Sequence, residues 1–310
     1  MASPESTGPG RFWIFARERF DPPSHLVMIG LFLVGHVAIQ AAVSGADGAL
    51  AHLAALPPLA ALLLGTVAFF FKLRLYDEIK DYEVDCEHNP GRPLARGLVS
   101  HRDLHVGIVV CIGIELACFG LASVRSLPAA AVAVGYSLLM YREFFIGRHI
   151  RPHLTTYAVS HTVVTVLLSL TISSALARQL AWELGRPALC FALNNWCLFN
   201  IFEFGRKTFS SAEEREGVES YSKIFGRYGA VVLVLSQAAL SSLCLHLMAL
   251  PSATGLVFYT AGLGGLLLAI GLAYATSDRP GPAKLYRVMS SVHIVLVYVG
   301  FLVVFRGPLF

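Results

Sequence analysis

Long apolar stretches alternate along the chain with short polar segments. Because the hydrocarbon core of a bilayer is about 30 Å thick, a helix that crosses it needs roughly 20 apolar residues. The fourth stretch is short, which predicts that its helix extends into the aromatic residues at 141–145. The pattern therefore predicts an all-α integral membrane protein with nine transmembrane helices. We expect them near residues 25–44, 56–75, 104–122, 128–141, 154–176, 187–204, 229–249, 255–276 and 288–305.

The charges of the connecting segments test this count, because Lys and Arg concentrate on the cytoplasmic side of a membrane. Of the 24 Lys and Arg residues, all but four lie in the N-terminal tail or in segments on the same side of the membrane as the tail. This asymmetry supports nine spans, with the N-terminus in the cytoplasm and the C-terminus outside. The four exceptions are Arg125, Arg178, Arg186 and Arg306.

The composition agrees with a membrane protein and excludes other classes. Hydrophobic residues make up 55% of the 310 residues and charged residues only 14%, and a soluble chain of this length could not bury so much apolar surface. Disorder needs a high net charge, whereas the net charge of +4 is small and too balanced to indicate nucleic-acid binding.

We expect a cytoplasmic tail over residues 1–24, without a signal peptide, and one transmembrane domain over 25–306. Its polar loops near 72–103 and 203–228 are the candidate active-site loops.

Three aspartates, Asp77, Asp81 and Asp85, recur at every fourth residue in the first of these loops. This spacing stacks them on one face of a helix, where carboxylates repel each other unless a counter-charge lies between them. Mg²⁺ suits this position, because it binds one or two carboxylates together with substrate phosphate oxygens. Arg74 and Arg92 supply donors suited to phosphate. The alternative is a solvated helix end with internal salt bridges, but acidic residues near a transmembrane core usually face a functional cavity.

The same segment resembles the first motif of the UbiA superfamily of intramembrane prenyltransferases, Asn-Asp-x-x-Asp-x-x-x-Asp followed by Arg-Pro-(Leu/Ile)-x-x-Gly. Here the motif reads Asp77-Glu78-x-x-Asp81-x-x-x-Asp85, and Arg92 begins the sequence Arg-Pro-Leu-Ala-Arg-Gly. The resemblance covers nearly the whole chain, since the family has nine helices and carries both of its motifs on the cytoplasmic side. It implies a UbiA-like bundle in which Asp77, Glu78, Asp81 and Asp85 bind Mg²⁺ and the three aspartates are catalytic.

The second motif of the family, an Asp-x-x-x-Asp pair at the cytoplasmic end of helix six, is altered in this chain. Gly217 and Gly226 match the glycines that follow the pair, but neither aspartate is present. An alignment with a short insertion places Glu203 on the first aspartate and Lys207 four residues later, whereas an ungapped alignment places Glu213 on the second. We favour the first alignment, because Glu203 continues the apolar helix. Glu203 is then expected to be a catalytic metal ligand and Lys207 a diphosphate contact, and a plain ion pair between the two is the alternative.

Four further residues carry weaker signals. Arg142 follows the fourth helix, where family members carry basic residues near the diphosphate, so it is a candidate diphosphate contact or a cytoplasmic loop anchor. Glu115 lies inside the third predicted span without a visible partner, which makes it a functional candidate. Asn194 and Asn195, in the sixth span, are expected to bond to neighbouring helices.

The resemblance implies an Mg²⁺-dependent prenyltransferase that ionises a polyprenyl diphosphate and transfers the prenyl group to an acceptor, which the family suggests is aromatic. Some superfamily members look like terpene cyclases, which cyclise farnesyl or geranylgeranyl diphosphate without an acceptor. The altered second motif keeps this alternative open. A transporter or a lipid-binding scaffold is disfavoured, because the acidic clusters lie at helix ends on one face of the membrane. We expect a multi-pass protein of the inner membrane, if bacterial, with its active site facing the cytoplasm and with neither a nucleic acid nor a protein as partner.

Overall fold

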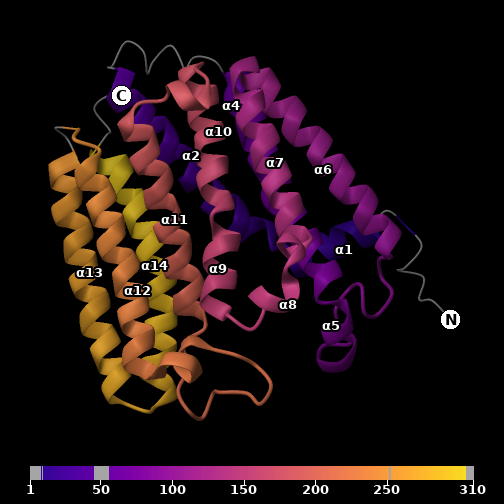
Figure 1. Ribbon diagram of the computed structural model, residues 1–310, viewed down its shortest axis with the longest axis vertical. Helices are drawn as coiled ribbons and strands as arrows, with labels where there is room; N and C mark the ends of the chain where they lie inside the picture. Colours follow the sequence, from indigo (N-terminus) through magenta and orange to yellow (C-terminus); the bar gives the residue numbers. More distant parts are fainter. Residues whose placement is uncertain (1–7, 9, 45–55, 251–252, 305–310) are drawn as a thin grey trace.

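The computed structural model describes residues 8, 10–44, 56–250 and 253–304, and over these residues the chain is helical, without β-strands. The long helices run side by side in one bundle (Figure 1). This architecture confirms the all-α prediction. The α-helices are α1 (Gly10–Arg19), α2 (Pro22–Ser44), α4 (Leu56–Lys80), α5 (Tyr82–His88), α6 (His101–Ala122), α7 (Leu127–Tyr141), α8 (Gly147–Ile150), α9 (Leu154–Thr162), α10 (Val164–Ala177), α11 (Arg186–Arg206), α12 (Tyr221–Leu247), α13 (Ala253–Thr276) and α14 (Pro280–Val304).

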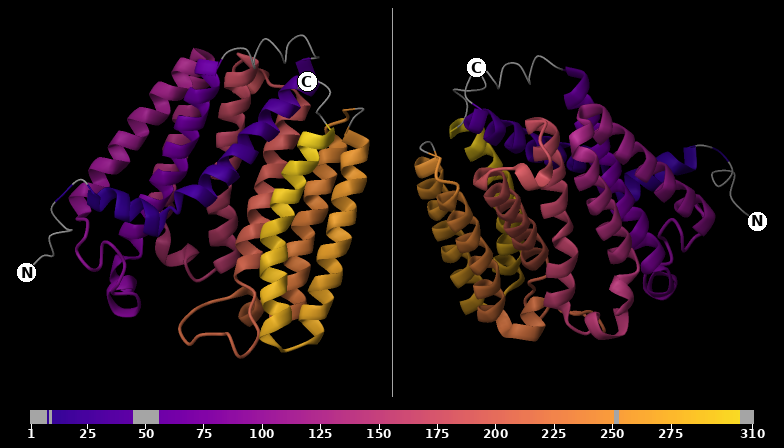
Figure 2. Two further views of the ribbon diagram at one scale, coloured as in Figure 1. Left: turned by 180° about the vertical axis from the view of Figure 1, so that it is seen from behind. Right: turned by 45° about the horizontal axis from the view of Figure 1, so that its top comes forward.

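The long helices pack in chain order around the bundle. α4 packs against α6, α7 against α10, and α11 against α12, while α12, α13 and α14 follow one another. α14 packs against α2, and α2 against α4, so the ring of helices is closed. The short helix α1 lies crosswise to the long helices near the start of α6 (Figure 2).

Eight helical segments among the described residues are long and apolar enough to cross a membrane. They correspond to eight of the nine predicted spans, with α9 and α10 together forming one of them. The remaining predicted span, at 187–204, is the helix α11, in which three asparagines interrupt the apolar sequence. The count of nine spans and the cytoplasmic N-terminus stay predictions.

The three asparagines of α11 are buried and bond to the neighbouring helices. The Ser241 hydroxyl of α12 donates to Asn194 at 2.7 Å. Asn195 donates to a serine of α10 at 3.0 Å and accepts from the Tyr298 hydroxyl of α14 at 2.9 Å. Asn200 accepts from a threonine of α9 at 2.6 Å and donates to a glutamine of α12 at 3.1 Å. The asparagines therefore fix α11 inside the bundle, where unpaired polar groups would be costly.

A buried ion pair joins α4 to α6. Lys72 Nζ lies 2.6 Å from Glu115 Oε2, and neither side chain is exposed. The ammonium group also lies 4.7 Å from the centre of the Phe69 ring. The second carboxylate oxygen of Glu115 has no hydrogen-bond partner among the described residues. Glu115 thus has the partner that the sequence did not reveal, and the pair holds α4, the helix that carries Asp77 near its end.

The expected extension of the fourth span into residues 141–145 is wrong. α7 ends at Tyr141, and the next residues form a short 3₁₀ turn. Glu143, Phe144 and Phe145 have φ angles of 51°, 54° and 58°, in the left-handed region that residues other than glycine rarely adopt. This turn reverses the chain and directs it into α8.

Candidate active site

The two polar segments that the sequence singles out lie at the same end of the bundle (Figure 1). α4 ends there at Lys80 and leads into α5, while α11 ends there at Arg206, before the loop 207–220. The positive charge of Arg206 acts on Asp77. The ends of α4 and α11 therefore share one electrostatic environment, as a site built from both motifs requires.

The three aspartates follow one helical path across the junction of α4 and α5. The Asp81 N–H donates to the Asp77 carbonyl at 2.9 Å, and the Asp85 N–H donates to the Asp81 carbonyl at 2.8 Å. Asp77 is half-exposed, Asp81 is exposed and Asp85 is buried. The predicted stacking holds for the backbone, but the three carboxylates lie in different environments.

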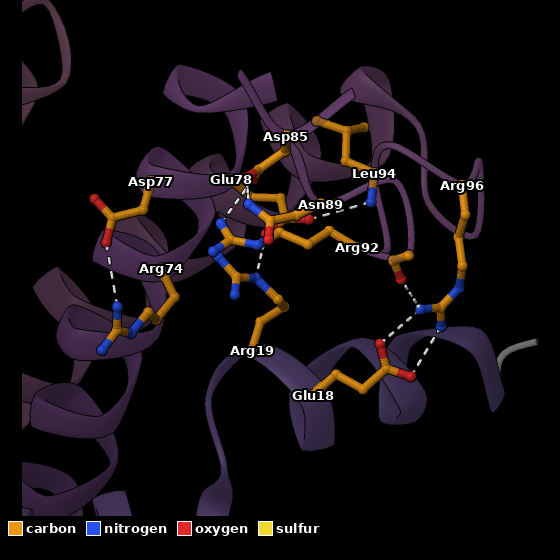
Figure 3. A network of polar contacts seen from close by, with 11 residues as sticks. Glu18, Arg19, Arg74, Asp77, Glu78, Asp85, Asn89, Arg92, Leu94 and Arg96 are labelled. Atoms are coloured by element: carbon orange, nitrogen blue, oxygen red, sulfur yellow. Dashed lines mark hydrogen bonds and ion pairs between the residues drawn. The ribbon is translucent and has the colours of Figure 1, made fainter. Parts of the chain in front are cut away.

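Asp77 and Asp81 are the least engaged of the three. Among the residues that the structure describes, Asp77 makes one ion-pair contact, a long one of 3.4 Å with Arg74 (Figure 3). Within the part of the chain that the structure describes, the Asp81 carboxylate has no hydrogen-bond or ion-pair partner. Desolvation by the surrounding protein and the negative charges of Asp77 and Asp85 raise the pKa of Asp81, against the opposing charges of Lys80 and Arg92. A cation bound here would relieve this repulsion.

Asp85 is held by its own loop. Arg92 Nη1 lies 2.7 Å from Asp85 Oδ2, and the Asn89 amide donates to Asp85 Oδ1 at 3.1 Å. The side chain of Asp85 is only 4% exposed and that of Arg92 is 31% exposed. The predicted ligand Asp85 and the predicted diphosphate contact Arg92 are therefore paired with each other (Figure 3).

Glu78 points into the protein, away from its neighbour Asp77 (Figure 3). Its side chain is 1% exposed. One carboxylate oxygen pairs with Arg19 of α1, and the other accepts the Leu94 N–H at 3.1 Å. Both oxygens are thus engaged by the protein, so Asp77 and Asp81 are better placed than Glu78 to bind a metal ion.

The second segment brings together Glu203, Arg206 and Lys207 at the end of α11. Glu203 Oε1 lies 2.9 Å from Lys207 Nζ, and Glu203 Oε2 lies 2.6 Å from the Arg206 guanidinium. The side chain of Lys207 is 28% exposed. Arg206 was not among the predicted site residues, although its position three residues after Glu203 on one helix predicts this contact. These three side chains therefore carry a net positive charge, and the charge of Arg206 acts on Asp77.

Glu213, the residue that the ungapped alignment favoured, is engaged elsewhere. Its carboxylate pairs with Arg287 of α14 and accepts the Ser210 N–H at 3.1 Å. The hydrogen bond from Arg287 is the main reason that the pKa of Glu213 is lowered to about 2. This pair fixes the loop 207–220 to α14.

We expect a Glu213→Gln variant to lose stability in a pH-dependent manner. The pKa of Glu213 is depressed from its ordinary 4.5 to about 2 in the fold, so its stabilisation is fully present above pH 4.5 and is lost as the pH falls toward 2. The gap in Tm between wild type and variant should therefore narrow between pH 7 and pH 3. Glu219→Gln, an exposed change in the same loop, is the control. A gap that stays constant with pH would contradict the assignment.

An open pocket of about 270 Å³ lies beside the end of α4. Its cationic lining residues are Lys80, Arg142 and Arg151. Arg151 Nε donates to both oxygens of Glu143, at 2.8 and 2.7 Å, while Arg142 has no acidic partner among the described residues. The structure thus places the predicted residue Arg142 in a pocket whose positive charges outnumber the single carboxylate.

The donor set at the end of α4 fits Mg²⁺ bound together with a phosphorylated ligand. Within the described ranges, no three acidic, histidine or cysteine side chains converge into a ready-made metal site. Mg²⁺ does not need such a cage, because it keeps several waters and is held by one or two carboxylates plus phosphate oxygens. The unpartnered Asp81 and the loosely held Asp77 meet this requirement.

Comparison with known proteins agrees with the fold and with the family that the sequence resembles. The UbiA prenyltransferase family matches residues 38–297. A digeranylgeranylglyceryl phosphate synthase from Thermococcus sibiricus is 26% identical over 271 residues, which cover 81% of this chain and 86% of the relative. The apo structure of a UbiA homolog from Aeropyrum pernix K1 superposes with a TM-score of 0.55 and 18% identity, covering 87% of this chain and 97% of that one. A structure described as that of a digeranylgeranylglyceryl phosphate synthase in membranes gives a TM-score of 0.57 at 14% identity, covering 96% and 99%. These two structures confirm the predicted UbiA-like bundle.

Proposed function

The chain belongs to the UbiA prenyltransferase family and is a multi-pass membrane prenyltransferase, and we propose that it ionises a prenyl diphosphate in an Mg²⁺-dependent reaction at the ends of α4 and α11. The prenyl group then passes to an acceptor with a negatively charged head group. The observation that carries this proposal is the Asp81 carboxylate, which lacks a partner among the described residues although Asp77 and Asp85 repel it. From the asymmetry of Lys and Arg we propose that the site faces the cytoplasm, in the inner membrane if the source is bacterial.

The metal proposal rests on the first acidic segment. Enzymes of this family generally use a divalent metal ion. Asp77 and Asp81 would hold Mg²⁺, while Asp85, Glu78 and Glu203 are already paired with cationic side chains. When bound, the ion would neutralise charge that develops on the departing diphosphate.

Cationic side chains around the aspartates would bind the diphosphate. Arg74 makes only a long contact with its aspartate, Arg142 lines the pocket beside α4, and Lys207 is partly exposed at the end of α11. Positively charged groups placed where the leaving group gains charge lower the barrier to its departure. Arg92 is bound to Asp85, so its main contribution would be to orient the acidic loop.

Aromatic rings between α2, α4 and α11 would line the path of the prenyl chain. The rings of Phe70 and Phe199 are stacked with their centres 5.8 Å apart, and Phe32 packs edge-on against both. Phe70 lies two helical turns before Asp77, and Phe199 lies one turn before Glu203. The interior next to the two polar segments is therefore apolar. Such walls exclude water that would quench an allylic cation, and aromatic faces stabilise the cation.

Lys80 and Arg151 line the same pocket as Arg142, and their positive charge beside the diphosphate would favour an acceptor that carries negative charge. Two kinds of acceptor fit this requirement. One is a hydroxylated aromatic acid, as the resemblance to the family suggests. The other is the hydroxyl group of a prenylated glyceryl phosphate, as the name of the relative from Thermococcus sibiricus suggests. The new bond between the acceptor and the prenyl carbon replaces the carbon–oxygen bond to the diphosphate, and the acceptor then loses one proton to the released diphosphate or to water, which completes the exchange.

A product assay in three arms tests the proposal. Purified protein is incubated with Mg²⁺ and geranylgeranyl or farnesyl diphosphate, together with 4-hydroxybenzoate, with geranylgeranylglyceryl phosphate, or without acceptor. We expect a prenylated acceptor in one of the first two arms, and EDTA should abolish its formation. A cyclic hydrocarbon or alcohol in the third arm would identify a terpene cyclase instead. Monodisperse protein that releases no diphosphate in any arm would contradict the proposal.

A further inference from the structure

The N-terminal helix α1 is tied by ion pairs to three separate segments around the candidate site. Arg11 Nη2 lies 2.9 Å from Asp103 at the start of α6. Glu18 accepts two hydrogen bonds of 2.8 Å from Arg96 in the loop after α5. Arg19 pairs with Glu78 near the end of α4. Because these contacts join residues 59 to 92 positions apart, α1 connects elements that are not neighbours in the sequence. Figure 3 shows the contacts of Glu18 and Arg19.

Apolar packing anchors the same helix. Phe15 and Phe20, in and just after α1, are 2% and 3% exposed. Both pack edge-on against Phe71 of α4, with ring centres 6.1 and 5.3 Å apart. α1 is thus packed against α4 within two turns of Asp77, and the ion pairs fix its direction.

Glu78 is the point at which α1, α4 and the loop 89–99 meet. One carboxylate oxygen binds Arg19 of α1 and the other accepts the Leu94 N–H of the loop. Because Glu78 is almost fully buried, removal of Arg19 would leave a buried carboxylate with one neutral donor, which is unfavourable. The same loop carries Arg92, which holds Asp85. The orientation of the acidic segment therefore depends on Arg19.

We propose that Arg19 and Glu78 are positioning residues, through which α1 holds the acidic end of α4 and the Arg92 loop in the geometry that binds the metal–diphosphate complex. This inference rests on the proposed function. It gives Glu78 a role in the motif other than metal binding. This buried side chain, next to Asp77 in the sequence, holds the end of α4 against α1 and the loop 89–99. The remaining polar face of the helix end is then left for substrate.

Two measurements on the Arg19→Ala variant in nanodiscs test this role. The first is hydrogen–deuterium exchange of the loop 89–99 without substrate, which should become about tenfold faster when a charged hydrogen bond to a buried group is lost. The second is kinetics, in which KM for Mg²⁺ and for the prenyl diphosphate should rise about tenfold with kcat changed by less than about threefold. Arg17→Ala, an exposed arginine of the same helix, is the control and should change neither quantity.

Further variants separate positioning from general loss of structure. Arg19→Lys keeps the charge and should restore most of the affinity, while Glu78→Gln should match Arg19→Ala. The double variant Arg19→Ala/Glu78→Gln should have KM values no higher than those of the more impaired single variant, because both changes remove the same interaction. Unchanged exchange and unchanged KM in Arg19→Ala would overturn the proposal. The exchange experiment needs no turnover, so it decides the role of α1 even if the product assay refutes the proposed reaction.

Discussion

An Asp81→Asn variant is expected to lose at least about 100-fold in turnover, the loss typical when one group that stabilises transition-state charge is removed. The carboxylate has no partner within the described residues, so the change breaks no contact of the fold. Its raised pKa means that ionised Asp81 opposes folding at neutral pH, since a carboxyl group with a higher pKa in the folded state binds protons more readily there. The variant should therefore be at least as stable as the wild type while it loses activity.

Diphosphate release and Tm, measured on the same preparation, check this expectation. Glu83→Gln is the matched control, because Glu83 is an exposed acidic residue of the adjoining helix α5 and its loss changes the net charge by the same amount. The control should keep near-normal turnover. An Asp81→Asn protein with full turnover would remove the argument that this carboxylate binds the metal ion.

A Glu115→Leu variant is expected to lose about 3–5 kcal/mol of unfolding free energy, the usual cost of removing one partner of a buried ion pair. The change leaves the Lys72 amino group without its carboxylate inside the bundle, where its side chain is not exposed at all. Replacing both residues, with Lys72→Met and Glu115→Leu together, should recover most of the loss, because apolar side chains of similar volume replace buried pairs at little cost. Equilibrium unfolding in mixed micelles measures all of these variants. A double variant no more stable than the single one would contradict a role for the pair as such.

The helices could be predicted from the sequence because the thickness of the bilayer sets their length, so no knowledge of tertiary contacts is needed. The prediction for the fourth span was wrong at its C-terminal end, for a local reason. Phe144 and Phe145 look like a continuation of an apolar helix, but their left-handed φ angles belong to a turn. Nothing in their apolar side chains signals that conformation.

The sequence predicted which residues form the candidate site better than it predicted the directions in which their side chains point. Asp77, Glu78 and Asp81 stand close together in one motif, yet successive residues on a helix point about 100° apart. That rotation turns Glu78 toward α1 and leaves Asp77 and Asp81 outside. The partner of Glu78, Arg19, lies 59 residues away in a tail whose polar composition suggested no part in the site.

The same dependence on side-chain orientation explains why the pairing of Lys72 with Glu115 was not predicted. Glu115 is an isolated charged residue in an otherwise apolar span, whereas Lys72 begins the first polar segment, and 43 positions separate the two. Their pairing depends on how α4 and α6 are rotated against each other, and spacing within either helix does not contain that information. Glu203 and Lys207 stand four residues apart on one helix, so their contact could be predicted from spacing alone.

In the proposed reaction, a divalent cation joins the carboxylates at the end of α4 to the diphosphate. Anomalous diffraction from crystals grown with Mn²⁺ and a non-hydrolysable prenyl diphosphate analogue tests it most directly. We expect an anomalous peak that contacts both a diphosphate oxygen and the carboxylate of Asp77 or Asp81. A bound analogue whose diphosphate lies away from both aspartates, or contacts them without an intervening metal peak, would contradict it.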